Sequence, residues 1–268
     1  IPFLLFALFQ LKFAIITPAI ISGSFAERIR FRSYILFMLL FTIFIYSPLA
    51  HMTWHPDGLF RSWGVLDFAG GTVVHMSAGL AAFTGAIFLG QRKKIIEKPA
   101  NIPFVILGTG MLWFGWFGFN AGSALGANFD AVVAFANTSL ASATSMITWI
   151  FYDRFSNRKM SSIGACIGAI VGLVAITPAA GFVTLGQSIF IGFIAAVVSN
   201  VAVKINKKSK VDDTLDVFAT HGIGGIVGMI LTAVFANEVG LIYGETTTFI
   251  YHIVTIIITV VFTLLMSY

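Results

Sequence analysis

Two histidines, His75 and His221, lie inside long apolar runs, where an ionisable side chain is unusual. Each is the eighth residue of its run, and small residues surround both. A neutral imidazole offers one hydrogen-bond donor and one acceptor, and it can relay a proton near neutral pH. A single histidine of this kind is as often a core residue bonded to a backbone carbonyl as a functional group. Two at matched positions in opposite halves favour a functional site.

An aspartate precedes each histidine, Asp67 in DFAGGTVVH and Asp216 in DVFATHG. A carboxylate at a helix start accepts hydrogen bonds from the free backbone amides and suits the helix dipole. We therefore predict that both aspartates cap their helices. A buried cap can also shape a cation site, and this second interpretation stays open for Asp67 more than for Asp216.

Aromatic residues crowd the stretch LWFGWFGFNAGSALG, which ends close to Ser123. One interpretation is a belt of rings at the membrane surface. The other is a cation site, because aromatic faces attract cations and a hydroxyl accepts a hydrogen bond from them. Trp54, at the end of an earlier apolar run, is expected on the same side of the membrane.

Long apolar segments must position these side chains. The chain has 268 residues, of which 58% are hydrophobic and 10% charged, with a mean hydropathy of +0.94. A soluble domain carries about 25% charged residues, so the composition predicts an all-α polytopic membrane protein. The net charge of +5 does not indicate nucleic-acid binding, because no basic face is interleaved with aromatic residues. The predicted spans are 1–25, 33–53, 68–90, 101–122, 128–152, 162–183, 185–203, 214–236 and 246–268.

Basic residues fix the orientation of these nine spans. Fourteen of the 16 Lys and Arg residues fall in alternate gaps, which predicts that those gaps are cytoplasmic. The third and eighth spans, which hold the histidines, then run in opposite directions, as in an inverted repeat with a site near the midplane. At 1.5 Å per residue the two histidine Cα atoms would lie about 10 Å apart along the membrane normal. Contact therefore requires recessed helix starts or tilt. The predicted cytoplasmic loops are 26–32, 91–98, 153–159 and 204–210.

Several motifs resemble the ammonium transporter (Amt/Rh) family. They are DFAGGTVVHMSAGLAA, FGWFGFNAGS, VDDTLDVFATHGIGGIVG, SGSFAERIRF and AHMTWHPDG. The resemblance implies an inverted repeat of five plus five helices and an eleventh helix that embraces them. The chain would hold helices three to eleven as one membrane domain over 1–268, without the first two helices and the C-terminal tail. It also implies a homotrimer with one pore in each subunit.

The resemblance assigns roles to residues as well. Trp54, Ser123 and Phe13 would recruit ammonium at the outer face, supported by Asp67. Phe13 and Phe119 would form a phenyl gate. His75 and His221 would be paired pore imidazoles. Trp116 would line the pore.

The expected function is ammonium uptake, in which ammonium is deprotonated and ammonia and a relayed proton cross separately, in a plasma membrane of bacterial inner-membrane type. A P-II-type regulator is an expected partner. The alternative is an ammonium sensor that signals through a fused C-terminal domain. No cofactor, metal or enzymatic activity is expected, because neither histidine has a carboxylate or cysteine at ligand spacing or a nucleophile beside it. Lys12 would repel a cation, so we expect it to face a neighbouring subunit or another helix.

Overall fold

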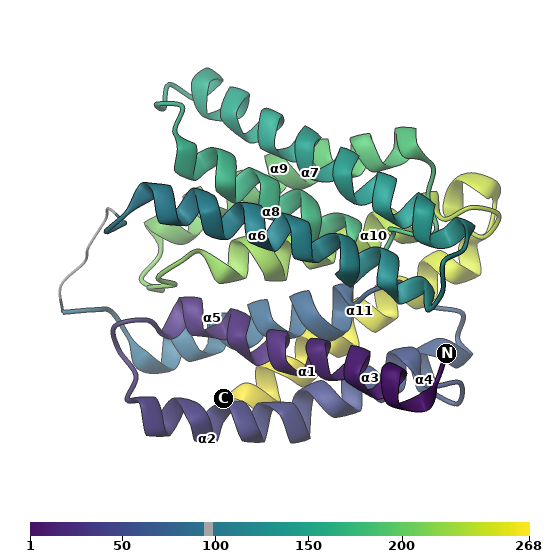
Figure 1. Cartoon of the computed structure of the whole chain (residues 1–268). Coiled ribbons are helices and arrows are strands. Elements are labelled where there is room, and N and C mark those ends of the chain that lie inside the picture. Colours follow the sequence, from purple (N-terminus) through teal and green to yellow (C-terminus); the bar gives the residue numbers. More distant parts are fainter. Residues whose placement is uncertain (94–98) are drawn as a thin grey trace.

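The structure is a computed structural model that describes residues 1–93 and 99–268, and the regular structure of this described part is entirely helical. Figure 1 shows long helices side by side, and neighbours along the chain run in opposite directions. The predicted all-α membrane fold is confirmed. Its α-helices are α1 (Phe3–Phe25), α2 (Phe31–Phe41), α3 (Ser47–Trp54), α4 (Leu59–Ser62), α5 (Ser77–Leu89), α6 (Ile102–Ala121), α7 (Phe129–Phe155), α8 (Ser162–Ile176), α9 (Leu185–Lys208), α10 (Gly224–Phe235) and α11 (Thr246–Ser267).

Short helical turns of other types join or extend these helices. The π-helical turns are η1 (Thr42–Tyr46), η2 (Gly71–Met76) and η4 (Phe218–Ile223), and the 3-10 turns are η3 (Gly122–Ala124) and η5 (Leu241–Tyr243). π-Helical turns are rare and occur frequently at functional sites. Two of the three carry the intramembrane histidines, so the helices that present those side chains are irregular where they begin.

Eight of the nine predicted spans form helices long and apolar enough to cross a membrane. The exception is the predicted span 162–183, which forms the shorter helix α8 and then turns through residues 177–182. Pro178 contributes to the early end, because a proline has no backbone N–H to continue the helical hydrogen bonds, and Thr177 itself still has helical backbone angles. The helix therefore stops at Ile176, and Thr177 is left at its end, inside the protein.

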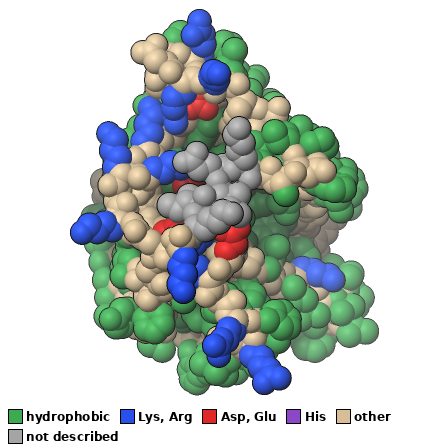
Figure 2. All heavy atoms as spheres, turned by 90° about the vertical axis from the view of Figure 1, so that its left-hand side faces the viewer, with side chains coloured by type: hydrophobic (Ala, Val, Ile, Leu, Met, Phe, Trp, Pro, Cys, Tyr) green, Lys and Arg blue, Asp and Glu red, His purple; other side chains and the backbone are tan. Residues whose placement is uncertain are grey.

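One end of the molecule is basic. Figure 2 shows Lys and Arg side chains gathered on the face that lies at the left of Figure 1, around the segment that is not described. The connections α1–α2, α5–α6, α7–α8 and α9–α10 lie at this end, as the alternation of basic gaps predicts. Lys94 and Lys98, which belong to the predicted loop 91–98, lie outside the described residues. The excess of Lys and Arg at this end agrees with the prediction that these loops are cytoplasmic.

Glycines let the two groups of helices meet. Figure 1 shows α1–α5 in one group and α6–α10 in another, and α11 passes between them. A Cβ atom on Gly79 would lie 2.1 Å from the backbone nitrogen of Gly222, so only glycine allows α5 and η4 to approach so closely. A Cβ on Gly225 would lie 3.1 Å from the carbonyl oxygen of Gly71, which brings α10 against η2 in the same way.

Candidate functional site

The two intramembrane histidines meet. The Nδ1 atoms of His75 and His221 lie 3.2 Å apart, and their ring centroids are separated by 5.3 Å. His75 is fully buried, whereas His221 is partly exposed. The helices that hold them start at Gly71 and Phe218, later than the predicted spans 68–90 and 214–236. These recessed starts, with the close glycine contacts, remove the separation that straight helices of full length would impose.

Asp67 holds the start of the first histidine helix. Its Oδ1 accepts hydrogen bonds from the backbone N–H groups of Gly70 (2.8 Å) and Gly71 (2.6 Å). Its Oδ2 accepts from the backbone N–H (2.8 Å) and the hydroxyl (2.5 Å) of Thr72. The carbonyl oxygen of Asp67 accepts a hydrogen bond from the indole N–H of Trp54 at 3.0 Å. The same residue therefore caps η2 and fixes Trp54.

The second helix start is held by Asp213, and the prediction that Asp216 caps it is wrong. The backbone N–H of Phe218 donates to Asp213 Oδ2 at 2.7 Å, while Asp216 Oδ2 lies 3.6 Å from the ammonium group of Lys207. Asp216 has a left-handed backbone, with φ of 55°, which turns the chain into the helix. Burial raises the pKa of Asp213, and burial raises that of Asp216 to about 6 against the opposing charge of Lys207.

A row of aromatic rings leads from the outer end to the histidines. Trp54 packs edge-on against Phe13 with centroids 5.5 Å apart, and Phe13 lies 4.4 Å from Phe119 with the two planes tilted by 38°. Phe119 is 6.0 Å from the ring of His75. Trp116 lies beside Phe119, with centroids 5.4 Å apart, and stacks on His75 at 5.3 Å with an interplanar angle of 16°. Phe13 is only 2% exposed, so the row is closed at this point.

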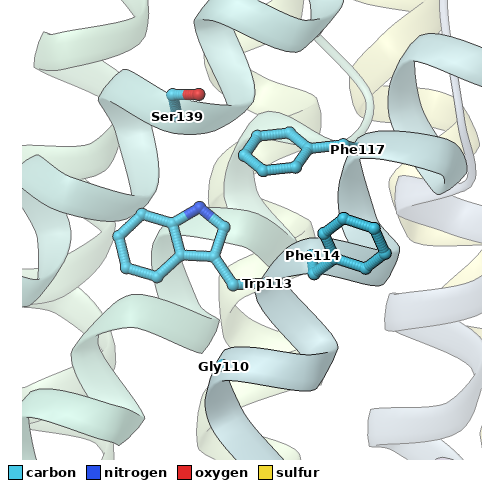
Figure 3. Close-up of a pocket in the computed structure, with 5 residues that line it drawn as sticks. All are labelled: Gly110, Trp113, Phe114, Phe117 and Ser139. Atoms are coloured by element: carbon cyan, nitrogen blue, oxygen red, sulfur yellow. The ribbon is translucent and has the colours of Figure 1, made fainter.

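The rest of the aromatic stretch faces elsewhere. Figure 3 shows Trp113, Phe114 and Phe117 around a surface hollow of about 350 Å³ with Gly110 of α6 and Ser139 of α7. Phe114 is 79% exposed, and Phe117 stacks on Phe135 of α7 at 4.0 Å. Trp116 and Phe119 therefore turn toward the histidines, while Phe114 and Phe117 lie on the outer surface of the helix, and both interpretations of this stretch stay predictions.

Ser123 and Lys12 occupy less central positions. The Ser123 hydroxyl donates to the carbonyl oxygen of Phe119 at 2.8 Å, and among the described residues no hydrogen bond joins it to Trp54. Lys12 is exposed on α1, whereas its neighbour Phe13 is buried. Because adjacent helical residues point about 100° apart, the ammonium group of Lys12 lies away from the aromatic row.

Thr177 belongs to the site, although the sequence analysis did not single it out. Its hydroxyl donates to the carbonyl oxygen of Leu173 at 2.8 Å and accepts from the indole N–H of Trp116 at 2.9 Å. The same oxygen lies 3.4 Å from Nε2 of His75. Thr177 is 102 positions from His75 in the chain and follows a helix that ends early, so no local spacing indicates the contact. The sequence analysis also left out His252 of α11.

Three comparisons with known proteins agree. A family model described as the Ammonium Transporter Family matches residues 1–268. A protein of Aquifex aeolicus (strain VF5) named "Ammonium transporter" is 48% identical over 272 residues, which cover 99% of this chain and 64% of that protein. The crystal structure of Candida albicans Mep2 has a TM-score of 0.94 and 35% identity, over 100% of this chain and 63% of that one.

A solved structure described as "Sensor Amt Protein" has a TM-score of 0.89 and 29% identity, over 96% of this chain and 68% of that one. The chain thus spans roughly two thirds of the length of these relatives. A family model that covers the whole chain, close sequence relatives and a shared helical fold lead to the same result. The chain is a multi-pass membrane protein that belongs to the ammonium transporter family.

Proposed function

We propose that this protein carries ammonium inward by binding the cation at the outer face, removing a proton, and conducting ammonia past His75 and His221 while the proton is relayed separately. The observation that carries the proposal is the histidine pair, 3.2 Å apart and enclosed by rings at the end of an aromatic row. The membrane would be a bacterial inner membrane. Residues 1–268 would act as one membrane domain in a homotrimer, open to control by a P-II-type regulator.

The outer site would consist of Trp54, Phe13 and Ser123, with Asp67 behind them. The rings of Trp54 and Phe13 offer aromatic faces to a cation. Asp67 is 7% exposed, and its carboxylate oxygens accept four hydrogen bonds from N–H and O–H donors. A buried negative charge near the site attracts a cation without binding it directly. Ser123 would add its hydroxyl oxygen as an acceptor.

The phenyl pair, Phe13 and Phe119, would separate this site from the histidines. Rings 4.4 Å apart leave no room for a hydrated ion, so a cation that passes must lose water that the rings cannot replace. Neutral ammonia does not meet this cost. A potassium ion has no proton to release and would be excluded, which gives the site its selectivity.

The hydrogen bonds around Thr177 define how the histidines would present their nitrogens. The Thr177 hydroxyl donates its proton to the carbonyl oxygen of Leu173, so its oxygen can only accept a hydrogen bond from His75. The proton of neutral His75 is therefore placed on Nε2. His75 Nδ1 is then an acceptor, and His221 Nδ1–H donates to it. His221 Nε2 is left as the acceptor for an N–H of ammonia or for a proton.

The test is electrical. Proteoliposomes that contain the full-length protein are placed on a solid-supported membrane and given an ammonium jump. We expect a sustained current that saturates with ammonium concentration and no current with potassium. In His75→Ala/His221→Ala we expect the ammonium current or the potassium exclusion to be lost. A double variant that keeps both unchanged would remove the histidines from the mechanism.

The second candidate is an ammonium sensor, which is favoured by the likeness to the solved "Sensor Amt Protein". In a sensor, the same outer site would report its occupancy to a signalling domain. The electrical test separates the two candidates. A brief binding transient without sustained current supports the sensor, whereas a sustained current supports the transporter.

A further inference from the structure

A third histidine, His252 of α11, lies outside the pair and is fully buried. Its Nε2 accepts a hydrogen bond from the backbone N–H of Leu66 at 2.9 Å. On the other side of the ring, Nδ1 lies 3.3 Å from the carbonyl oxygen of Met229 in α10. The imidazole thus spans from the segment before η2 to the helix that follows His221.

The two partners fix the protonation of the ring. A backbone N–H can only donate, so Nε2 must carry a lone pair, and a carbonyl oxygen can only accept, so Nδ1 must carry the proton. A neutral histidine satisfies both partners at once. An aliphatic side chain in its place would leave the Leu66 N–H and the Met229 carbonyl without this partner.

The segment that His252 holds is the one that builds the outer site. Leu66 directly precedes Asp67, whose carbonyl accepts from Trp54 and whose carboxylate caps η2. The neighbouring residue, Tyr251, stacks on Trp63 of the same segment with centroids 5.4 Å apart and an interplanar angle of 23°. The outer end of α11 therefore holds the segment 63–66 at two points, and the hydrogen bond from Leu66 is the one next to the ammonium-facing groups.

We propose that His252 is a positioning residue for the outer ammonium site, which sets the places of Asp67 and Trp54 through Leu66 without touching the substrate. The proposal rests on the proposed function, because it requires that the outer site binds ammonium. Its consequence is specific to binding. Weakening the contact displaces Asp67 and Trp54 most, whereas the phenyl pair and the histidine pair also have direct contacts of their own and shift less.

The experiment measures ammonium-driven current against concentration for His252→Leu, His252→Gln and Thr255→Val in the full-length protein. His252→Leu should raise the half-saturating ammonium concentration by about five- to tenfold, the effect of losing the hydrogen bond that holds Leu66. It should change the maximal current by less than about twofold. His252→Gln should restore most of the affinity, because an amide offers both an acceptor and a donor. Thr255→Val is the matched control, since Thr255 is equally buried on the same helix and its hydroxyl has no hydrogen-bond partner in the described structure.

A double variant separates positioning from general damage. If His252 acts through the outer site, His252→Leu should add little to the loss of affinity already caused by Trp54→Leu, because coupled residues are not additive. Additive losses would overturn the proposal, as would a fall in maximal current with unchanged half-saturation or a glutamine variant no better than leucine. If the wild-type protein gives no saturable ammonium response, the proposed function itself fails. If the wild type responds and His252→Leu responds in the same way, only the role of His252 is refuted.

Discussion

The two helix starts that carry the pore histidines follow one plan but are stabilised differently. In each, an aspartate lies eight residues before the histidine, Asp67 before His75 and Asp213 before His221. A π-helical turn that contains the histidine then leads into an α-helix. Asp67 accepts four hydrogen bonds with both oxygens occupied. Asp213 accepts from Phe218 with Oδ2, while its Oδ1 is buried and without a partner in the described structure.

The surroundings of the two helix starts also differ. The outer start lies among aromatic rings, and a single carboxylate there is satisfied by backbone amides. The inner start lies beside an ion-pair cluster in which Arg92 binds Asp212 at 2.9 Å and Glu27 at 3.2 Å. Arg28 donates to the carbonyl oxygens of Ser24 and Gly90 and to that of Asp212 at 2.5 Å. The repeat therefore uses one geometry twice: the first start is satisfied by its own backbone amides, and the second lies beside ion pairs that join the connections α1–α2, α5–α6 and α9–α10.

The largest contrast is expected between Asp67→Asn and Asp213→Asn. Asparagine at 67 turns an NH2 group toward backbone donors, and each buried donor left without a partner costs about 1–3 kcal/mol. We expect Asp67→Asn to abolish the ammonium current and to lower the thermal unfolding temperature. Asp213→Asn keeps an oxygen for Phe218 and should stay within about 1 kcal/mol of the wild type. Similar losses in the two variants, measured by current and by thermal unfolding in detergent, would break the contrast.

The close approach of the two halves gives the next prediction. A Cβ on Gly79 would lie 2.1 Å from Gly222, so Gly79→Ala must push η4 away and part the histidines. We expect less than about a tenth of the wild-type current, since a displacement of about 1 Å can cost about a hundredfold in rate. Gly225→Ala, with its nearest atom at 3.1 Å, should lose less. Gly186→Ala on α9 meets no atom within 4 Å and serves as the control. Equal currents in all three variants would contradict the close-contact argument.

Sequence patterns predicted the larger features of this molecule because those features are local or periodic. Nine apolar runs and the alternating basic gaps were enough to predict the helices and their alternating directions. The matched positions of His75 and His221 predicted the inverted repeat. The prediction of a cap at Asp216 rests on its place directly before the apolar run that holds His221, whereas the spacing of eight from Asp67 to His75 selects Asp213. The contacts of Thr177 and His252 join segments 102 and 186 residues apart, and no local pattern encodes them.

The two pore histidines differ in how many side chains contact them, and this difference leads to a prediction for Thr177. His75 is in contact with Trp116 and Thr177, whereas among the described residues His221 has His75 as its hydrogen-bond partner. Thr177→Val removes the acceptor that keeps the proton on His75 Nε2, and we expect the current to fall by about tenfold at unchanged half-saturation. Thr177→Ser retains the hydroxyl and should remain close to the wild type. A valine variant with normal maximal current would show that the hydroxyl does not orient the pair.

The smallest effect is expected at the cytoplasmic end, from the titration of Asp216. Because burial raises its pKa to about 6, the folded protein binds the proton more tightly than the unfolded chain does. This contribution to stability is fully present below the unfolded pKa of about 3.9 and is lost as the pH rises through 6. Asp216→Asn cannot ionise, so its unfolding temperature should exceed that of the wild type by a few degrees at pH 7, and the gap should close toward pH 4. Asp57→Asn, at a carboxylate that is 91% exposed on the outer side, should follow the wild type throughout. A gap for Asp216→Asn that is constant with pH would mean that the ion pair with Lys207 balances burial. A variant less stable than the wild type at pH 7 would mean that the ion pair outweighs burial, and the second helix start would then be stabilised by charge where the first is stabilised by hydrogen bonds.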